Sequence, residues 1–413
     1  MKSMSNEKKT RGLNRRQFLQ RGALAAAGVS MMPSRVLGNS FLEVLGPTSP
    51  KRVVICGAGL AGMVAGYELS QLGHNVTILE ARMRPGGRAH TLREPFSDGL
   101  YAEAGAARIP DNHDLTLKYI KMFDVSLEPM YPSRQQAVRL DGGQRRVVGP
   151  EGFTEALGQN FGSELGGNPS RWSKVKGGTD LFPKAFAQRL ADKIHYGAPV
   201  VRIEQDANSA RAIFLHNNSP ETISADHILC AMPFSVLRRV ELPATNFSER
   251  KRDIIQKLQY DSVSRVYLQS KKRFWEEKGL SGFAFTNEAV EIWQPTWSQP
   301  GPRGILMTYA RPGQAESIAS LKETERISST LTQLDGIFPG LRENFEGGTS
   351  KVWMEDEWSR GAWSFVGPRD FVTANQAEGR IHFAGEHLSP FFSWMQGALQ
   401  SGLRAVKEIN EAV

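Results

Sequence analysis

A glycine-rich turn between a predicted strand and a predicted helix restricts the fold of this chain more than any other segment. The apolar run Arg52–Cys56 predicts a buried parallel strand, and the six residues after it read G-A-G-L-A-G, a match to G-x-G-x-x-G. Small and apolar residues then recur at helical spacing over Ala61–Leu72, and His74–Leu79 predicts a second strand. This order of elements predicts a βαβ unit of the Rossmann type.

Each glycine of the turn has its own physical reason. Gly57 permits the tight turn, Gly59 lets the backbone approach a pyrophosphate, and Gly62 lets the helix pack on the strand. The helix that begins near Ala61 points its positively polarised N-terminus at the phosphates. Glu80 follows 18 residues after Gly62, close to the expected spacing for an acid that binds a ribose. The sequence therefore predicts a dinucleotide site.

The distribution of charge argues against nucleic acid as a partner. The formal net charge is +8, but residues 1–38 hold eight Lys or Arg and one acid, so about +1 is left for the remainder. A basic face for nucleic acid therefore loses its main support, and no nucleic-acid partner is predicted. At 413 residues, 40% of them hydrophobic, the chain is long enough for two domains with their own cores.

Residues 1–38 resemble a twin-arginine signal peptide. Arg15 and Arg16 precede an apolar stretch over Gly22–Met32, and Val36-Leu37-Gly38 follows with small residues suited to cleavage. The apolar stretch is about half the length needed to cross a bilayer, so no stable membrane span is predicted. Twin-arginine export carries folded proteins, and we expect a periplasmic or secreted protein that binds its cofactor before export.

The string that follows the second strand resembles a known family. Glu80, Ala81 and Arg82 are followed by Gly86-Gly87-Arg88, which gives E-A-R-x-x-x-G-G-R. This is similar to the signature of the flavin monoamine oxidases, which include L-amino acid oxidases and polyamine oxidases. The resemblance implies FAD, with Gly87 close to the pyrophosphate and with Arg82 and Arg88 supplying positive charge. Structural salt bridges are the alternative role of both arginines.

The resemblance continues through the chain and implies further contacts with the cofactor. Val200 would meet the adenine through its backbone, Glu386 would bind the ribityl or phosphate region, and Met395 would present a helix-start amide to the flavin. Because the chain has no cysteine just upstream of the last strand, where some members attach their flavin, we expect non-covalent FAD. The other residues that the resemblance assigns to FAD are Gly105, Ala106, Ala107, Arg108, Gly385, Trp394 and Ala398.

The resemblance also assigns residues to an amine substrate. Arg108 falls where L-amino acid oxidases bind the substrate carboxylate, and Tyr309 falls where a tyrosine bonds the same group. Trp363 and Trp394 fall near the two positions that wall the amine against the flavin. Arg265 stands nine residues before Phe274-Trp275, where the family usually has a lysine. The positive charge is kept there but its geometry is not, so the resemblance supports fast reaction of the reduced flavin with oxygen less strongly than it supports amine oxidation. For Arg108, a tie to a neighbouring acid is the alternative role, and Tyr309 could be a buried structural residue.

The signals interleave along the chain and predict an α/β fold of two domains. We expect a Rossmann-type FAD-binding domain from residues 51–110, 176–245 and 370–413. An α+β substrate-binding domain is expected from residues 111–175 and 246–369.

The leading prediction from sequence is oxidation of an L-amino acid to an imino acid, with oxygen or another acceptor taking the electrons. The alternatives are oxidation of an amine without a carboxylate, a tryptophan-type monooxygenase, and a non-catalytic flavoprotein. No metal site is predicted, and a homodimer is possible. Cys56 and Cys230 are expected to be buried thiols rather than a disulfide, and His113 and His387 to have surface or core roles.

Overall fold

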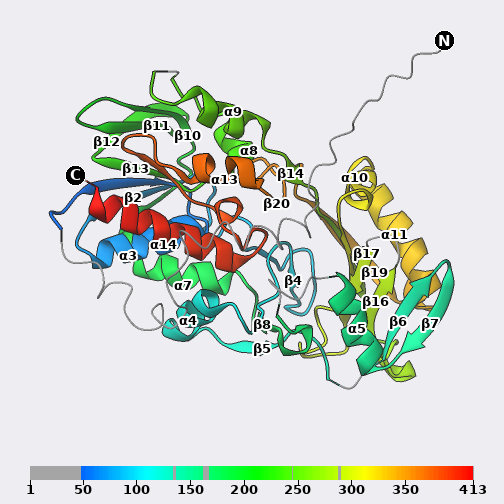
Figure 1. Cartoon of the computed structure of the whole chain (residues 1–413). Coiled ribbons are helices and arrows are strands. Elements are labelled where there is room, and N and C mark those ends of the chain that lie inside the picture. Colours follow the sequence, from blue (N-terminus) through cyan, green and yellow to red (C-terminus); the bar gives the residue numbers. More distant parts are fainter. Residues whose placement is uncertain (1–47, 134–135, 161–166, 244, 287–289, 413) are drawn as a thin grey trace, which may run out of the picture.

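The computed structural model describes residues 48–412, except 134–135, 161–166, 244 and 287–289. The predicted signal peptide lies outside the described residues. Two lobes stand side by side in Figure 1, one built on a parallel sheet and the other on a mostly antiparallel sheet.

The first lobe is built on five parallel strands whose order in the sheet differs from their order in the chain. Apolar side chains fill these strands because both faces of the sheet are covered. Val53 pairs with Val76 on one side and with His227 on the other. The order is β21 (Ile381–Phe383), β13 (His227–Cys230), β1 (Arg52–Cys56), β2 (Asn75–Glu80) and β9 (Ile194–Tyr196).

Helices cover one face of this sheet and a small antiparallel sheet covers the other. The helices are α3 (Leu60–Gln71), α4 (Asp114–Met122), α7 (Leu181–Arg189) and α14 (Met395–Glu411), which share one hydrophobic cluster with the strands. The small sheet is formed by β10 (Val200–Gln205), β11 (Ala210–His216) and β12 (Ser219–Ala225). The predicted βαβ unit is thus present, and both faces of its sheet are buried.

The second lobe is built on a seven-stranded sheet. All neighbours in it are antiparallel except β16 and β6, which run parallel. The order is β19 (Phe345–Val352), β15 (Ser264–Ser270), β18 (Gly304–Ala310), β17 (Val290–Trp293), β16 (Leu280–Thr286), β6 (Gln136–Asp141) and β7 (Gln144–Val148). The helices α10 (Gln314–Ala319) and α11 (Glu323–Ile337) pack on it, and α5 (Pro150–Asn160) lies near β6 and β7.

Further short elements complete the two lobes and the region between them. They are β3 (Thr91–Leu92), β4 (Ala102–Glu103), β5 (Leu127–Pro129), β8 (Ser173–Val175), β14 (Tyr260–Asp261), β20 (Trp363–Ser364), α8 (Phe234–Leu237), α9 (Glu249–Lys257), α12 (Leu341–Asn344) and α13 (Pro368–Asn375). Helices α4 and α9 fall within ranges predicted for the substrate domain, and yet they pack into the two clusters around the five-stranded sheet. The domain boundaries themselves stay a prediction.

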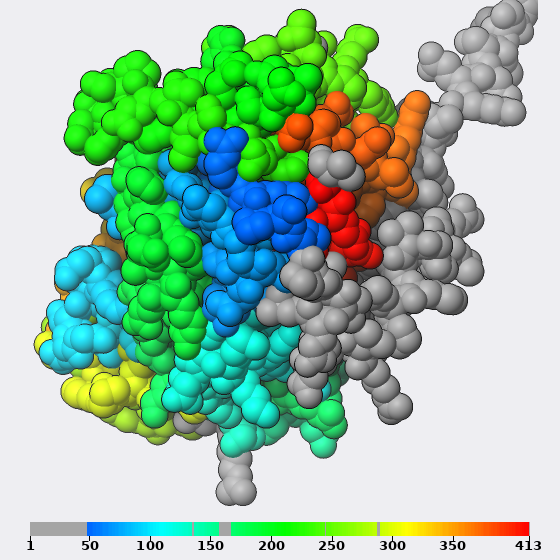
Figure 2. Space-filling model, turned by 90° about the vertical axis from the view of Figure 1, so that its left-hand side faces the viewer, coloured from blue at the N-terminus to red at the C-terminus, as the bar shows by residue number. Residues whose placement is uncertain are grey.

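The C-terminal helix is fixed to the start of the first strand. The Nζ atom of Lys51 donates hydrogen bonds to the carbonyl oxygens of Ile409, Asn410 and Ala412 at 2.8, 2.8 and 2.6 Å. Figure 2 shows this junction, where the blue start of β1 lies beside red α14. Residues more than 350 positions apart thus complete one layer.

Three further findings apply to the described part of the chain. Cys56 and Cys230 are buried free thiols on neighbouring strands. None of the described helices combines the length and the apolar character that a membrane crossing needs. Within the same residues no cluster of His, Cys, Asp or Glu is suited to a metal ion.

Candidate active site

The glycine turn has the space and the polarity that a bound phosphate needs. Gly57 adopts a φ of +112°, and a Cβ atom on Gly62 would overlap the carbonyl oxygen of Gly57. At Gly59, in contrast, a Cβ atom would meet no protein atom within 4 Å. Gly59 also caps α3, which has no side-chain cap and no acid in its first turn. The turn therefore offers a helix N-terminus with open space in front of it.

Glu80 lies at the same turn. Its Oε2 accepts from the backbone N–H of Ala58 at 2.7 Å, and its Oε1 accepts from that of Arg82 at 2.9 Å. Burial raises the pKa of this carboxyl group. The acid is thus fixed beside the glycines, as its predicted role toward a ribose requires. Ala61 is buried in the first turn of α3, Ala81 follows Glu80 directly, and Val200 begins β10, half-buried against the cluster on the second face.

Arg82 and Arg88 both form ion pairs within the protein. Arg82 bonds Asp356 and, at 3.1 Å, the hydroxyl of Ser359. Arg88 bonds Glu386 at 2.8 Å and the carbonyl oxygen of Ala362 at 2.7 Å. The salt-bridge role that the sequence analysis left open is therefore present, and direct contact of either arginine with the cofactor stays a prediction.

The loops around these arginines approach each other closely. A Cβ atom on Gly87 would lie 3.7 Å from the Cα of Gly59, and one on Gly105 would overlap the carbonyl oxygen of Arg88. The N–H of Ala106 donates to that oxygen at 3.1 Å. Residues 57–62, 86–88 and 104–106 thus lie next to one another and form one strip, here called the cofactor edge, which an extended dinucleotide can contact.

The start of α14 is linked to the same edge through Glu386. The N–H of Ser393 donates to Oε2 of Glu386 at 2.7 Å, so that Glu386 joins Arg88 to the loop before the helix. Trp394 caps α14 without a side-chain hydrogen bond, and no acid stands in the first turn, which includes Met395 and Ala398. Gly385 comes directly before Glu386, and its N–H donates to the hydroxyl of Ser401. A second uncapped helix N-terminus therefore faces this edge.

Arg108 is buried in an aromatic cage. Its Cζ atom lies 4.2 Å from the ring centre of Trp293, 5.2 Å from that of Trp172 and 5.5 Å from that of Tyr309. Its Nε donates to the hydroxyl of Tyr131 at 3.0 Å. Ala107 immediately precedes it and is buried. Predicted residues Arg108 and Tyr309 are therefore brought together.

Glu291, which the sequence analysis did not identify, pairs with Arg108. Its Oε2 accepts from Nη2 of Arg108 at 2.5 Å and from Nε1 of Trp293 at 3.0 Å, and Oε1 accepts from Arg311. Burial alone would raise the pKa of Glu291, but Arg108 and Arg311 outweigh burial and hold it below its usual value. A single acid within the apolar strand Val290–Trp293 was the available sequence signal.

Arg265 contacts the same aromatic pair as Arg108. Tyr309 stacks on Trp293 with ring centres 5.1 Å apart, and the Cζ of Arg265 lies 4.8 Å from the centre of Tyr309. Nη1 of Arg265 donates to the carbonyl oxygen of Glu103 at 2.6 Å, and the hydroxyl of Tyr267 donates to the same oxygen. Arg265 therefore fixes the strand that leads to Arg108.

The two predicted tryptophans differ in their surroundings. Trp394 packs edge-to-face on Trp172 at 5.9 Å and on His113 at 4.8 Å. Trp363, like Trp394, packs against the hydrophobic cluster that contains Trp172 and Trp293, but its Nε1 donates to Asp261 at 2.7 Å. The structure thus brings Trp394 to the aromatic group around Arg108.

Both histidines noted in the sequence belong to the core. His113 and His387 are each 1% exposed. His387 lies against the rings of Phe234 and Tyr260, and burial holds its pKa well below the usual value.

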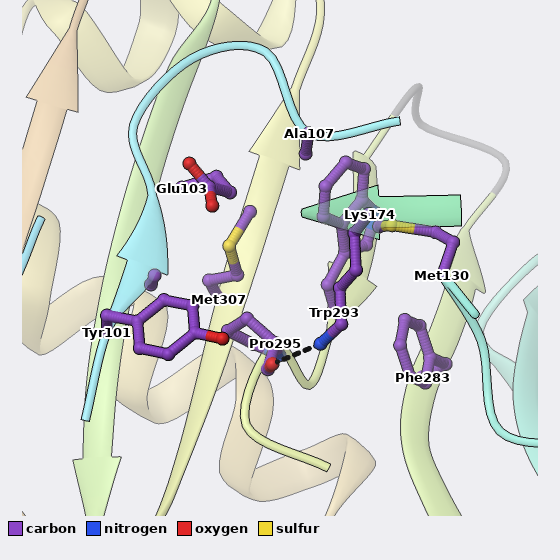
Figure 3. Close-up of a pocket in the computed structure, with 10 residues that line it drawn as sticks. Tyr101, Glu103, Ala107, Met130, Lys174, Phe283, Trp293, Pro295 and Met307 are labelled. Carbon is purple, nitrogen blue, oxygen red and sulfur yellow. Dashed lines mark hydrogen bonds between the residues drawn. The ribbon is translucent and has the colours of Figure 1, made fainter. Parts of the chain in front are cut away.

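A small cavity adjoins the aromatic cage (Figure 3). It encloses about 20 Å³, enough for a water-sized or methyl-sized group. Trp293 and Ala107 belong both to its wall and to the surroundings of Arg108. The remaining wall residues are Tyr101, Ala102, Glu103, Met130, Lys174, Phe283, Pro295 and Met307.

Comparison with known proteins identifies the family. The pattern of the flavin containing amine oxidoreductases matches residues 60–158 and 152–410. The chain belongs to this family. Its cofactor is therefore FAD, and the fold and enzyme class predicted from sequence are confirmed. The uncapped helix N-termini and the open space at Gly59 fit that cofactor, whereas non-covalent attachment stays a prediction.

Named relatives act on amino acids, and solved structures of similar fold act on amines. The chain is 32% identical to YobN of Bacillus subtilis (strain 168), named for an inferred L-amino-acid oxidase activity, over 87% of this chain and 95% of that protein. It is 27% identical to the flavin-dependent L-tryptophan oxidase RebO of Lentzea aerocolonigenes, over 87% and 98%. It is 25% identical to the L-amino-acid oxidase BmooLAAO-I of Bothrops moojeni, over 90% of this chain and 93% of that protein.

Putrescine oxidase bound to putrescine superposes with a TM-score of 0.74 at 20% identity, covering 88% of this chain and 99% of that chain. Cyclohexylamine oxidase from Brevibacterium oxydans IH-35A gives a TM-score of 0.74 at 19% identity, with the same two shares. At these identities the likeness concerns the fold alone. The enzyme is therefore a flavin-dependent oxidase of amines or amino acids.

Proposed function

We propose that this flavoenzyme oxidises the α-amine of an L-amino acid. The observation that carries the proposal is the buried guanidinium of Arg108, held at the end of the segment that lines the cofactor edge and surrounded by Trp172, Trp293 and Tyr309. A planar guanidinium matches a carboxylate, and a desolvated site strengthens that attraction. The L-tryptophan oxidase of Lentzea aerocolonigenes and the L-amino-acid oxidase of Bothrops moojeni support the same substrate class.

Each residue has a physical task in this reaction. Arg108 binds the carboxylate and orients the α-carbon, and Tyr309 adds a hydroxyl near the same group. Trp394 and Trp172 exclude water from the amine and stabilise it through their ring faces. Bound FAD supplies the hydride acceptor for the hydrogen on the α-carbon. The amino acid, oxygen and water together yield a keto acid, ammonia and hydrogen peroxide.

The test compares each amino acid with its own decarboxylated amine. Purified holoenzyme is mixed anaerobically with L-phenylalanine or phenethylamine, and with L-leucine or isopentylamine, while flavin absorbance is followed. We expect bleaching by the amino acids. Arg108→Met should lower the second-order rate constant of flavin reduction by amino acids about 100-fold, because the buried charged partner of the carboxylate is lost. The same rate constant for the amines should change little.

Arg108→Lys is the matched control, since it retains the charge near Glu291 and loses only the planar fork. An intermediate loss is expected for it, with FAD still bound. Bleaching by amines alone, with no effect of Arg108→Met, would contradict the proposal.

Oxidation of an amine without a carboxylate is the second candidate. The pair between Arg108 and Glu291 favours it, because that acid already neutralises one guanidinium. The same anaerobic comparison decides between the two candidates. Release of carbon dioxide with formation of an amide would instead indicate a monooxygenase.

We also propose export by the twin-arginine route, on the basis of residues 1–38 alone. Replacing Arg15 and Arg16 by Lys should retain the protein in the cytoplasm, where cell fractionation would find it with FAD bound. Unchanged export of that variant would contradict this route.

A further inference from the structure

The cavity beside Trp293 adjoins the group that is proposed to bind the substrate carboxylate. Trp293 contributes its ring to the cavity wall, and the same ring lies 4.2 Å from the Cζ of Arg108. Ala107, the residue before Arg108, forms another part of the wall, as Figure 3 shows. A group that extends from an α-carbon held at Arg108 therefore has this cavity within reach.

The polar side chains of the wall already have partners in the protein. The carboxyl group of Glu103 accepts from the N–H of Thr179 and from the hydroxyl of Thr91, both at 2.8 Å. Nζ of Lys174 donates to the carbonyl oxygen of Pro295 at 3.0 Å and lies 3.3 Å from Glu128. Because these groups are satisfied, an apolar group can enter the cavity without stranding them.

The hydroxyl of Tyr101, likewise, accepts from the N–H of Gly177 at 2.8 Å. The rest of the wall is apolar, and two of its members are methionines, Met130 and Met307. Thioether side chains adapt to slender apolar groups and contact them through dispersion. A charged substrate side chain would lose its hydration in this cavity, and it would find no polar group of the wall that is still available for pairing.

From this geometry we infer that the cavity receives the tip of the substrate side chain and selects a slender apolar one, as in leucine or methionine. The inference rests on the proposed function, since it requires a carboxylate at Arg108. With a volume of about 20 Å³ the cavity admits a methyl-sized tip, and an indole is too large for it.

Two neighbouring residues of β18 provide the test. Met307 lines the cavity, whereas Leu306 points to the opposite face and belongs to a different hydrophobic cluster. Met307→Phe fills the cavity, and Leu306→Phe is the matched control with the same added ring. Apparent dissociation constants from anaerobic flavin bleaching are measured for L-methionine, L-leucine, L-tryptophan and L-alanine. Binding of 4-methylpentanoate, followed by protein fluorescence, gives a readout without turnover.

We expect Met307→Phe to weaken the binding of L-methionine, L-leucine and 4-methylpentanoate about 10-fold or more, because a filled pocket rejects one or two methyl groups by this factor. L-alanine, whose side chain is too short to reach the cavity, should change less than two-fold. Leu306→Phe should change the apparent dissociation constants of all four amino acids by the same factor. If Met307→Phe does not fold, Ala102→Val narrows the same wall and should give the same pattern.

The outcomes separate the two proposals. Bleaching by amino acids with no selective effect of Met307→Phe or Ala102→Val would overturn the pocket and leave the proposed function standing. A ten-fold preference of the wild type for L-tryptophan over L-leucine would also overturn it. Bleaching by no amino acid at all would remove the proposed function and the pocket together.

Discussion

At the scale of single residues, the position of Arg108 depends on a buried acid contributed from another part of the chain. Glu291 is 3% exposed, and it accepts from Arg108, Arg311 and Trp293 at once. A desolvated carboxylate between two guanidinium groups holds their geometry, and its removal leaves buried charge without compensation. Glu291 therefore acts on the site through Arg108.

We expect Glu291→Gln to lower the free energy of unfolding by about 3 kcal/mol, because it breaks a buried pair while keeping the shape of the side chain. Urea denaturation followed by fluorescence measures the change. Glu241→Gln is the control, since Glu241 pairs with Arg202 on the surface and should matter little. Equal midpoints for the two variants would show that the buried pair contributes nothing.

At the scale of elements, the turn from β1 into α3 separates two demands on glycine. Gly62 is required by the protein itself, since a Cβ atom there would overlap the Gly57 carbonyl oxygen. Gly59 has open space in front of it and a φ of −73°, which any residue can adopt. The need for glycine at position 59 therefore comes from the cofactor.

Gly59→Ala and Gly62→Ala should consequently differ in kind. We expect Gly62→Ala to destabilise the cofactor-free protein by about 1 to 3 kcal/mol through overpacking. Gly59→Ala should leave the cofactor-free protein as stable or slightly more stable, by about 0.5 kcal/mol, and should weaken FAD at least 10-fold. Thermal unfolding without FAD and a fluorescence titration with FAD measure the two effects. Tight FAD binding by Gly59→Ala would contradict this assignment.

The residues proposed to bind FAD could be predicted from sequence because they belong to local patterns. Much of the proposed substrate site could not be predicted, because its residues come from distant parts of the chain. The turn, Glu80 and the start of α14 follow from residues that are close in sequence. Glu291 stands 183 positions from Arg108, and Trp172 and Tyr131 join the same cage from other segments. Such contacts depend on the pairing of β17 with β18 and on the packing of loops, and neither leaves a periodic signal.

At the scale of the whole molecule, buried histidines connect stability to pH. His227 and His382 lie at neighbouring strands with ring nitrogens 3.2 Å apart, and each is 3% exposed. Burial, reinforced by the neighbouring His382, lowers the pKa of His227 to about 4. In the unfolded chain the same imidazole titrates near 6.5. Unfolding therefore takes up a proton between these values.

The contribution of His227 to the free energy of unfolding is fully present above about pH 6.5. It is lost as the pH falls toward 4, and the total loss is about 3 kcal/mol. We expect His227→Gln to flatten the fall in unfolding free energy over this window, measured by urea denaturation at pH 4.5, 5.5 and 6.5. His216→Gln, at an exposed position, should keep the wild-type slope. Identical slopes for both variants would exclude His227 as the source.

The fold completes the cofactor edge with segments that are synthesised long after the glycine turn. Strand β21 and helix α14 complete the sheet and the layer that β1 and α3 began more than 300 residues earlier. At cellular rates of synthesis this separation corresponds to tens of seconds, roughly, during which α3 lacks its partner helix. A complete flavin site is therefore available only after strand β21 and helix α14 have been synthesised.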